Sequence, residues 1–170
     1  EREWKDGDVV TLDLPMPVRR VAGNPRIAAT RGQVALERGP IAYAFEGVDN
    51  EGSVFDAVLP ATATVAAEHR ESLLGGVTLL KVEGAQRAFR SESGEVSVKP
   101  AGLVAIPYAV WANRELGPMA VWLARDPSRA RLAPRPTIAS RARVSVSSHR
   151  GGMDPAHIND QLQPSNATDG

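Results

Sequence analysis

The chain has 170 residues, and its 20 basic side chains are matched by 20 acidic ones, which gives a formal net charge of zero. Its length suits one medium domain with part of another, and its apolar fraction of 42% is typical of a folded protein rather than a disordered one. Because cysteine is absent, a disulfide framework, a thiolate metal site and a cysteine nucleophile are excluded within these residues.

The sequence predicts a chain without a membrane segment. No apolar run approaches the roughly 18 residues that a membrane span needs. The first residues, 1–6, are charged and hold no apolar signal-peptide core. Arginine greatly outnumbers lysine, which is associated with GC-rich bacterial genomes. We therefore expect a soluble bacterial chain, either cytoplasmic or secreted, with no membrane partner.

Alternation of apolar and polar residues with a period of two is the dominant pattern along the chain. This pattern suits antiparallel strands that have one face buried and the other in water. The 13 prolines and 15 glycines are spread along the sequence, as expected when many short strands are joined by tight turns. The clearest alternating runs are 10–14, 62–68, 78–83 and 119–123.

Turn residues punctuate these runs and predict how the strands connect. The segment 91–94 ends in a glycine, which suits the positive-φ position of a tight turn. It lies between the extended runs 86–90 and 95–99 and therefore predicts a β-hairpin. Two stacked antiparallel sheets are the expected result, that is, an all-β, jelly-roll-like antiparallel β-sandwich domain over residues 1–124.

The composition changes after this domain. Residues 125–137 form an Arg/Pro-rich linker, and alternation returns beyond it. Asp154-Pro155 is typical of a helix N-cap followed by proline at the first helical position. We interpret residues 138–170 as the truncated beginning of a second β-domain with a short helix, too short to bury a core of its own.

Positive charge is concentrated in residues 125–150, which hold seven arginines and one acid, Asp126. Such a stretch could bind phosphates electrostatically. It has no interleaved aromatic residues and lies in no recognised nucleic-acid fold, so a linker that faces an acidic protein surface is the better interpretation. We therefore expect no nucleic-acid partner.

A set of short motifs recurs in order along residues 2–124. The most informative is 102–114, an apolar strand that ends in Pro-Tyr and continues into Trp-Ala-Asn-Arg. With these motifs the chain closely resembles the β-sandwich region that follows the helical-barrel catalytic domain in glycoside hydrolase family 127, the β-L-arabinofuranosidase-like enzymes. The other motifs are Trp4-Lys-Asp-Gly-Asp8, Leu14-Pro-Met16, Arg38-Gly-Pro-Ile-Ala-Tyr43, Glu46-Gly-Val-Asp-Asn50 and Leu73-Leu-Gly-Gly-Val77.

The resemblance implies a fold and a role rather than a chemistry for this chain. The resemblance implies that, in this family, the reaction takes place in an (α/α) barrel that has zinc-bound cysteines and a catalytic glutamate. None of these can be placed here, since the chain has no cysteine and no long helical pattern. We expect a non-catalytic β-sandwich accessory domain that packs against and stabilises the catalytic barrel domain. The zinc would lie in that missing domain, with no catalytic residue, metal ligand or cofactor in this chain.

The sequence Trp111-Ala-Asn-Arg114 is the best candidate for a ligand-contacting loop. The indole of Trp111 can stack on the CH groups of a sugar, while Asn113 and Arg114 can hydrogen-bond its hydroxyls. The alternative is structural, with Trp111 buried as an anchor, Asn113 closing a turn and Arg114 paired with an acid. The first interpretation predicts a carbohydrate-binding module for plant-type glycans, and the second predicts a scaffold. Trp4 and Trp122 are expected to pack in the core or at its rim.

Three further polar groups have both a chemical and a structural interpretation. The acids of 6–13 and 49–51 could serve as a carboxylate pair of an autonomous glycosidase if held about 5–9.5 Å apart, and 49–52 could hold calcium. Acids at turns more often act as caps. The cluster of His149, Asp154 and His157 could bind a metal, although a helix cap and a surface histidine account for it. The N-glycosylation pattern at 166–168 also occurs in many bacterial chains that are never modified.

Overall fold

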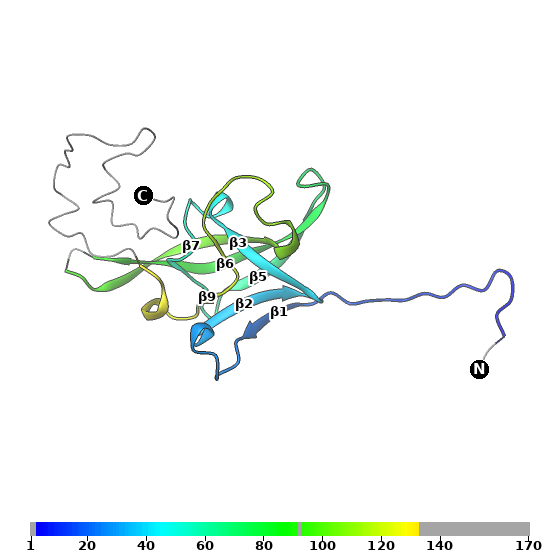
Figure 1. Ribbon diagram of the computed structural model, residues 1–170, viewed down its shortest axis with the longest axis horizontal. Helices are drawn as coiled ribbons and strands as arrows, with labels where there is room; N and C mark the ends of the chain where they lie inside the picture. The colour runs from blue at the N-terminus through cyan, green and yellow to red at the C-terminus, as the bar shows by residue number, and fades with distance from the viewer. Residues whose placement is uncertain (1–2, 92, 133–170) are drawn as a thin grey trace, which may run out of the picture.

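The computed structural model describes residues 3–91 and 93–132. Within them the chain forms nine β-strands, four one-turn 3₁₀ helices and no α-helix (Figure 1), which confirms the all-β prediction. The helices are η1 (Ala28–Thr30), η2 (Gly47–Asp49), η3 (Tyr108–Val110) and η4 (Pro127–Arg129). The strands are β1 (Val18–Ala22), β2 (Gln33–Arg38), β3 (Ile41–Glu46), β4 (Ala57–Val58), β5 (Thr64–Arg70), β6 (Val77–Arg90), β7 (Val96–Pro107), β8 (Met119–Ala120) and β9 (Leu123–Ala124).

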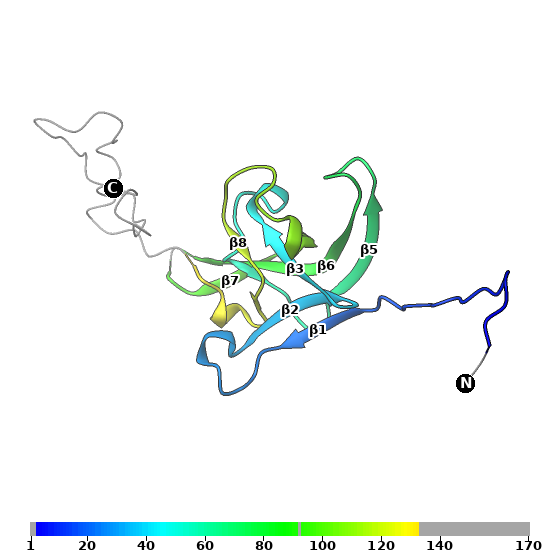
Figure 2. The same cartoon turned by 45° about the vertical axis from the view of Figure 1, so that its right-hand side comes forward.

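The strands form one continuous hydrogen-bonded ladder that folds back on itself. Its order is β1-β2-β9-β4-β6-β7-β3-β8, with β5 paired to β6. Because β2 also pairs with β3, the two halves of the ladder meet along a second seam. The pairings among the described strands are antiparallel except for that of β4 with β9. The layer of β1 and β2 lies below the layer of β3, β6 and β7 (Figure 1 and Figure 2), in agreement with a β-sandwich.

Apolar side chains from both layers fill the space between them. Leu36 of β2, Phe45 of β3 and Leu80 of β6 are fully buried and belong to one continuous cluster. Burying a side chain of this size stabilises a fold by roughly 1.5–3 kcal/mol. The cluster also takes in Tyr43, whose hydroxyl donates to the Thr78 carbonyl at 2.9 Å, so its polar end is satisfied within the core. The core therefore holds the β2–β3 pair against the long β6–β7 hairpin.

The long hairpin of β6 and β7 has the turn that the sequence predicts. The Gly94 amide donates to the Ser91 carbonyl at 2.9 Å, and the two strands pair in antiparallel register on either side. The predicted hairpin is confirmed. Its register shifts once, between Val82 and Ala85. Gly84 lies at this shift with a φ of 75°, a left-handed conformation that glycine adopts without strain.

The segment 3–17 differs from the prediction. The alternating run 10–14 predicts a strand, but the first strand begins at Val18, and the segment before it extends away from the body of the domain (Figure 1). Leu12 is 76% exposed because no described strand pairs with this segment. A period of two marks a surface that needs a partner and does not supply one. The expectation that Trp4 packs in the core or at its rim is also wrong, since its side chain is 63% exposed.

The alternating run 119–123 is divided between two strands. β8 ends at Ala120 and pairs with β3, whereas β9 begins at Leu123 and pairs with β2 and β4. The chain changes ladder partners between them, so no single strand can span the run. Trp122 lies at this change and is half-buried, in agreement with the predicted rim packing.

Several predictions fall outside the described residues: the second β-domain over 138–170, its helix, its histidine cluster and the glycosylation pattern. The predicted linker is described as far as residue 132. There η4 is capped by Asp126, whose carboxylate accepts a hydrogen bond from the Ser128 amide at 2.9 Å. In the part of the chain that the structure describes, no helix is long and apolar enough to cross a membrane.

A two-residue turn at Gly39 and Pro40 joins β2 to β3. Arg38 pairs with Ile41 across the turn, and Gly39 has a φ of 57°, as the first position of a type II′ hairpin turn requires. Met16 packs onto this turn, since a Cβ placed on Gly39 would lie 2.2 Å from the Met16 sulfur. Gly39 therefore serves both the backbone conformation and the contact.

We expect Gly39→Ala to destabilise the chain by about 1–2 kcal/mol, because alanine pays for a left-handed φ and the new methyl group displaces Met16. Urea unfolding followed by circular dichroism measures the change. Gly117→Ala is the matched control, since a Cβ at Gly117 meets no atom within 4 Å and its φ is not left-handed. Equal midpoints for the two variants would contradict this account of the turn.

Candidate functional site

The candidate loop is attached to the sheet through Glu46, the last residue of β3. Glu46 is only 5% exposed. One of its carboxylate oxygens accepts a hydrogen bond from the Ala112 amide at 2.7 Å, and the other accepts from the Arg114 guanidinium at 2.6 Å. A single buried carboxylate thus holds two points of a loop that lies more than sixty residues away in the sequence.

Arg114 connects Glu46 to a second acid, Asp49 of η2. Its guanidinium donates to both oxygens of Asp49, at 2.8 and 2.5 Å, in the fork geometry that arginine and carboxylate share. The hydrogen bonds to Asp49, and then those to Glu46, raise the pKa of Arg114 above its ordinary value, although burial opposes them. This Glu46–Arg114–Asp49 centre fixes the loop against the end of β3.

Asn50, which follows η2, ties the same region to β7. Its side chain is 1% exposed. The side-chain nitrogen donates to the carbonyls of Glu46 and Val104, at 2.7 and 2.9 Å, and the side-chain oxygen accepts from the Val104 amide at 2.9 Å. The amide therefore acts as a short piece of β-ladder, with its hydrogen-bonding groups satisfied despite complete burial.

Arg87 of β6 belongs to the same hydrogen-bond network as Asn50. It is 3% exposed, and its guanidinium donates to the Asn50 carbonyl, to the Ser53 carbonyl at 3.1 Å and to the Asp56 carboxylate at 2.9 Å. Its Nε also lies 3.2 Å from the carboxylate of Glu51. A buried guanidinium is tolerated only when it is paired in this way. The loop 50–56 is therefore organised around one arginine from the hairpin.

The aromatic residues of the candidate loop lie at its surface. Trp111 follows η3 and is 38% exposed, while Tyr108 is 45% exposed. Their ring centroids are 6.2 Å apart at an interplanar angle of 33°, within the range of favourable aromatic pairs. Ala112 has a φ of 59°, an unusual conformation for alanine, and its amide is the group that Glu46 holds. The side chain of Asn113 is exposed and donates to the Trp111 carbonyl at 3.4 Å.

The structure places the three predicted site residues in different environments. Arg114 is paired with acids, as the structural alternative requires, and Asn113 contacts its own loop. Trp111 is not the buried anchor of that alternative, because more than a third of its side chain is exposed. Ligand binding by the three residues stays a prediction.

Two residues of the site were missed from the sequence, Glu46 and Arg87. Each is a charged residue inside a run that is otherwise apolar or alternating, and a charge in such a position signals a paired, buried group. The acids of 49–51, which also suggested a catalytic pair or a calcium site, face arginines instead. Among residues 3–91 and 93–132, no three His, Asp or Glu side chains converge as metal ligands would.

Comparison with protein-family models matches residues 18–124 to the glycoside hydrolase family 127 C-terminal domain. The chain belongs to glycoside hydrolase family 127. The matched range begins with the first residue of β1 and ends with the last residue of β9, so the family 127 domain coincides with the folded ladder. The resemblance recognised from the motifs is confirmed.

Similar proteins carry this domain as a small part of a longer chain. A non-reducing end β-L-arabinofuranosidase of Bifidobacterium longum subsp. longum is 36% identical over 129 residues, which are 68% of this chain and 19% of that protein. The crystal structure of a family 127 β-L-arabinofuranosidase from Geobacillus stearothermophilus T6 matches with a TM-score of 0.59 at 37% identity, covering 65% of this chain and 18% of its own. The structure of another family 127 β-arabinofuranosidase matches with a TM-score of 0.65 at 35% identity, covering 70% and 19%. The chain therefore spans about a fifth of the length of these relatives.

We expect Arg114→Gln to lower the free energy of unfolding by about 2–3 kcal/mol. The substitution leaves the buried carboxylate of Glu46 without its cation, which costs roughly 3–5 kcal/mol in a fully buried pair, and we discount this because the Arg114 side chain is 18% exposed. Chemical denaturation measures the loss.

Arg70→Gln is the control for Arg114→Gln, because it breaks the exposed pair with Glu68, and exposed pairs contribute at most about 1 kcal/mol. The double variant Glu46→Gln/Arg114→Gln should recover part of the loss, since it removes the unpaired charge. Strictly additive effects of the two substitutions would argue against coupling between them.

Proposed function

We propose that this family 127 domain is a non-catalytic β-sandwich accessory domain of a β-L-arabinofuranosidase-like glycoside hydrolase, which packs against and stabilises a helical-barrel catalytic domain. The Glu46–Arg114–Asp49 centre carries this proposal. Both of its carboxylates are paired with the Arg114 guanidinium, so they hold a loop in place and are not free to act in proton transfer. The β-arabinofuranosidase names of the relatives support the class of parent enzyme.

The surface above this centre supports a partner domain. Val48, Tyr108, Trp111 and Leu116 are exposed apolar residues, of which Leu116 is 99% exposed. We name these four the loop patch. They lie on η2 and on the loop that follows β7, which are side by side in Figure 1 and Figure 2 and are joined by Arg114 and Asp49. A patch of exposed apolar side chains that rests on a fixed polar centre is suited to burial between domains.

In this proposal the bond-breaking chemistry belongs to the barrel. The zinc-bound cysteines that the family resemblance implies have no counterpart here, because the chain contains no cysteine. The residues of this domain do not fit a thiolate zinc site, and the metal is assigned to the catalytic domain together with the catalytic glutamate.

Carbohydrate binding is the second candidate function, and the exposed Tyr108–Trp111 pair favours it. Aromatic faces of this kind can stack on plant-type glycans. In this alternative Asn113 would contact sugar hydroxyls, and Arg114, already engaged by two carboxylates, would position the loop.

A chimera tests the scaffolding proposal. The chain alone should release no arabinose from a β-L-arabinofuranosyl disaccharide. Placed in the Bifidobacterium enzyme instead of the matching segment, it should support activity, and Leu116→Glu should shorten the half-life of that activity on heating severalfold, because a charge enters the buried patch. Phe89→Glu is the control, since Phe89 is 44% exposed and outside the loop patch. Robust arabinose release by the chain alone, or equal half-lives for the two variants, would overturn the proposal.

Trp111→Ala separates the two candidate functions. If the domain is a scaffold, isothermal titration with arabino-oligosaccharides should show no binding to the original chain or to the variant. Stability should fall by well under the roughly 3–5 kcal/mol of a fully buried tryptophan, because Trp111 is partly exposed. Measurable glycan affinity that disappears in a folded Trp111→Ala variant would instead establish the binding module.

A further inference from the structure

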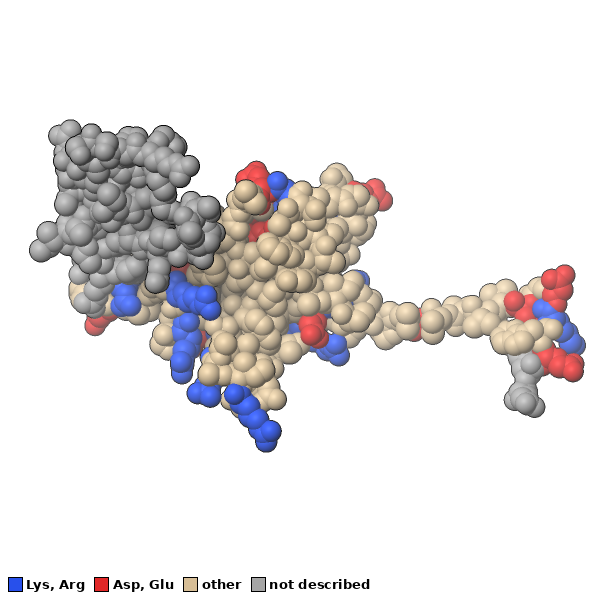
Figure 3. Space-filling model, in the orientation of Figure 1, with Lys and Arg blue, Asp and Glu red and all other residues tan. Residues whose placement is uncertain are grey.

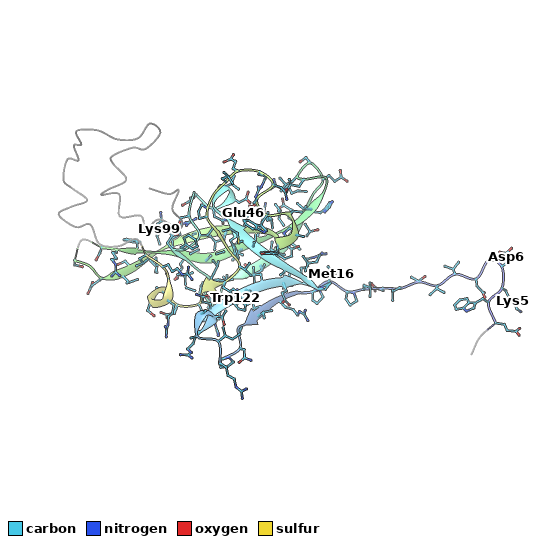
Figure 4. All side chains as sticks on the ribbon, in the orientation of Figure 1. Lys5, Asp6, Met16, Glu46, Lys99 and Trp122 are labelled. Atoms are coloured by element: carbon cyan, nitrogen blue, oxygen red, sulfur yellow. The ribbon has the colours of Figure 1, made fainter. Side chains whose placement is uncertain are left out.

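A hollow of about 240 Å³ lies beside β9, where η1 and η4 approach one another (Figure 1). Its lining includes two aromatic residues, Trp122 and Phe55, and two polar ones, Thr30 and Gln33. Its remaining polar lining comes from two arginines that follow β9. None of the residues of the loop patch lines it, so the hollow is separate from that patch. Figure 4 labels Glu46 beside the upper layer of strands and Trp122 beside the lower one.

The two arginines, Arg129 and Arg131, are held in place by the main chain around them. The Arg131 amide donates to the Phe55 carbonyl at 2.9 Å, and its guanidinium carbon lies 5.8 Å from the centre of the Phe55 ring. Arg129 packs its aliphatic part against Gly32, where a Cβ would lie 3.3 Å from the Arg129 Cγ. The contact with an aromatic face leaves the N–H edge of a guanidinium available for a ligand.

Neither guanidinium has an ion-pair partner within 4.0 Å in the described part of the chain. Arg129 and Arg131 take part in no ion pair among these residues, and both are exposed. The pKa of Asp126, the nearby acid, is lowered chiefly by hydrogen bonds from Ser128 and least by the charge of Arg129. Basic side chains gather on this side of the domain, over η1 and η4 (Figure 3). The exposed arginines of this region are Arg26, Arg31, Arg125, Arg129 and Arg131.

We infer that the hollow binds a carboxylate-bearing sugar, a uronic acid residue of an acidic polysaccharide. The guanidiniums of Arg129 and Arg131 would bind the carboxylate, in the planar two-point geometry for which arginine is suited. The indole of Trp122 would contact the apolar face of the ring, and Thr30 with Gln33 would face its hydroxyls. The choice of a saccharide among anions rests on the proposed function, and the choice of an acidic one rests on two exposed guanidiniums that form no close ion pair among the described residues.

The size and lining of the hollow favour a sugar over an acidic peptide. Its volume lies below the roughly 300–1,000 Å³ of sites for drug-sized ligands, so it suits one ring-sized group whose chain continues into solvent. An acidic peptide would be bound through its charge alone and would make no contact that requires the aromatic residues of the wall. A peptide is therefore an outcome that the experiment must separate.

Nuclear magnetic resonance of the ¹⁵N-labelled chain tests this inference, because the three tryptophans give three indole N–H signals that single Trp→Phe variants assign. Addition of α-1,4-digalacturonate should shift the Trp122 signal to saturation and leave the Trp111 signal in place. The neutral disaccharide α-1,4-galactobiose should bind more weakly by about tenfold or more, a factor that corresponds to roughly 1.4 kcal/mol.

Two variants with the same loss of charge separate a built site from general attraction. Arg129→Gln/Arg131→Gln should weaken digalacturonate binding by about tenfold or more, whereas Arg26→Gln/Arg31→Gln, outside the hollow, should weaken it much less. Both should keep the backbone spectrum of the folded chain. Equal weakening would overturn the inference in favour of long-range attraction, and equal Trp122 shifts with tri-glutamate or sulfate would overturn sugar recognition.

A digalacturonate shift at Trp111 instead of Trp122 would assign binding to the loop patch and overturn the site inferred here. Complete absence of binding would also overturn it, while the activity and heat stability of the chimera would be unaffected. The failure of this inference is therefore distinguishable from the failure of the proposed function.

Discussion

The buried ion pair between Glu46 and Arg114 is the constraint on which the candidate site depends. A carboxylate that is 5% exposed is stable only while its cation is present, so the loop after β7 cannot leave the end of β3 without a large cost. The pair also determines the loop conformation, because the same carboxylate holds the amide of Ala112, whose φ is 59°. The ion pair thus holds Ala112 in a strained backbone conformation and keeps the aromatic pair beside it at the surface.

Asn50 and Arg87 extend this constraint into the sheet. Asn50 satisfies the backbone of β7, and Arg87 holds the carbonyl of Asn50 from β6. Two of the family motifs, one around η2 and one after β7, are therefore parts of a single polar structure. Each carboxylate in it is paired with an arginine, Glu46 and Asp49 with Arg114 and Glu51 and Asp56 with Arg87.

The features of this fold that are local in sequence were predictable, and those that depend on distant partners were not. The hairpin turn at 91–94 is encoded by adjacent residues and is present as predicted. The run 10–14 has the right period for a strand but no described partner, and periodicity carries no information on partners. Glu46 and Arg114 are 68 residues apart. A lone acid and a lone arginine each look like surface residues until the fold brings them together.

The outer edge of β5 affects whether copies of the domain can associate with one another. This strand pairs only with β6 among the described strands, so its outer margin presents unsatisfied backbone groups to the surroundings. Charged side chains occupy its second half, where Glu68 contacts both Arg70 and Lys81. Charges on a margin of this kind oppose the docking of another chain. They therefore oppose the addition of further strands at this edge, which favours separate domains over growth into fibres.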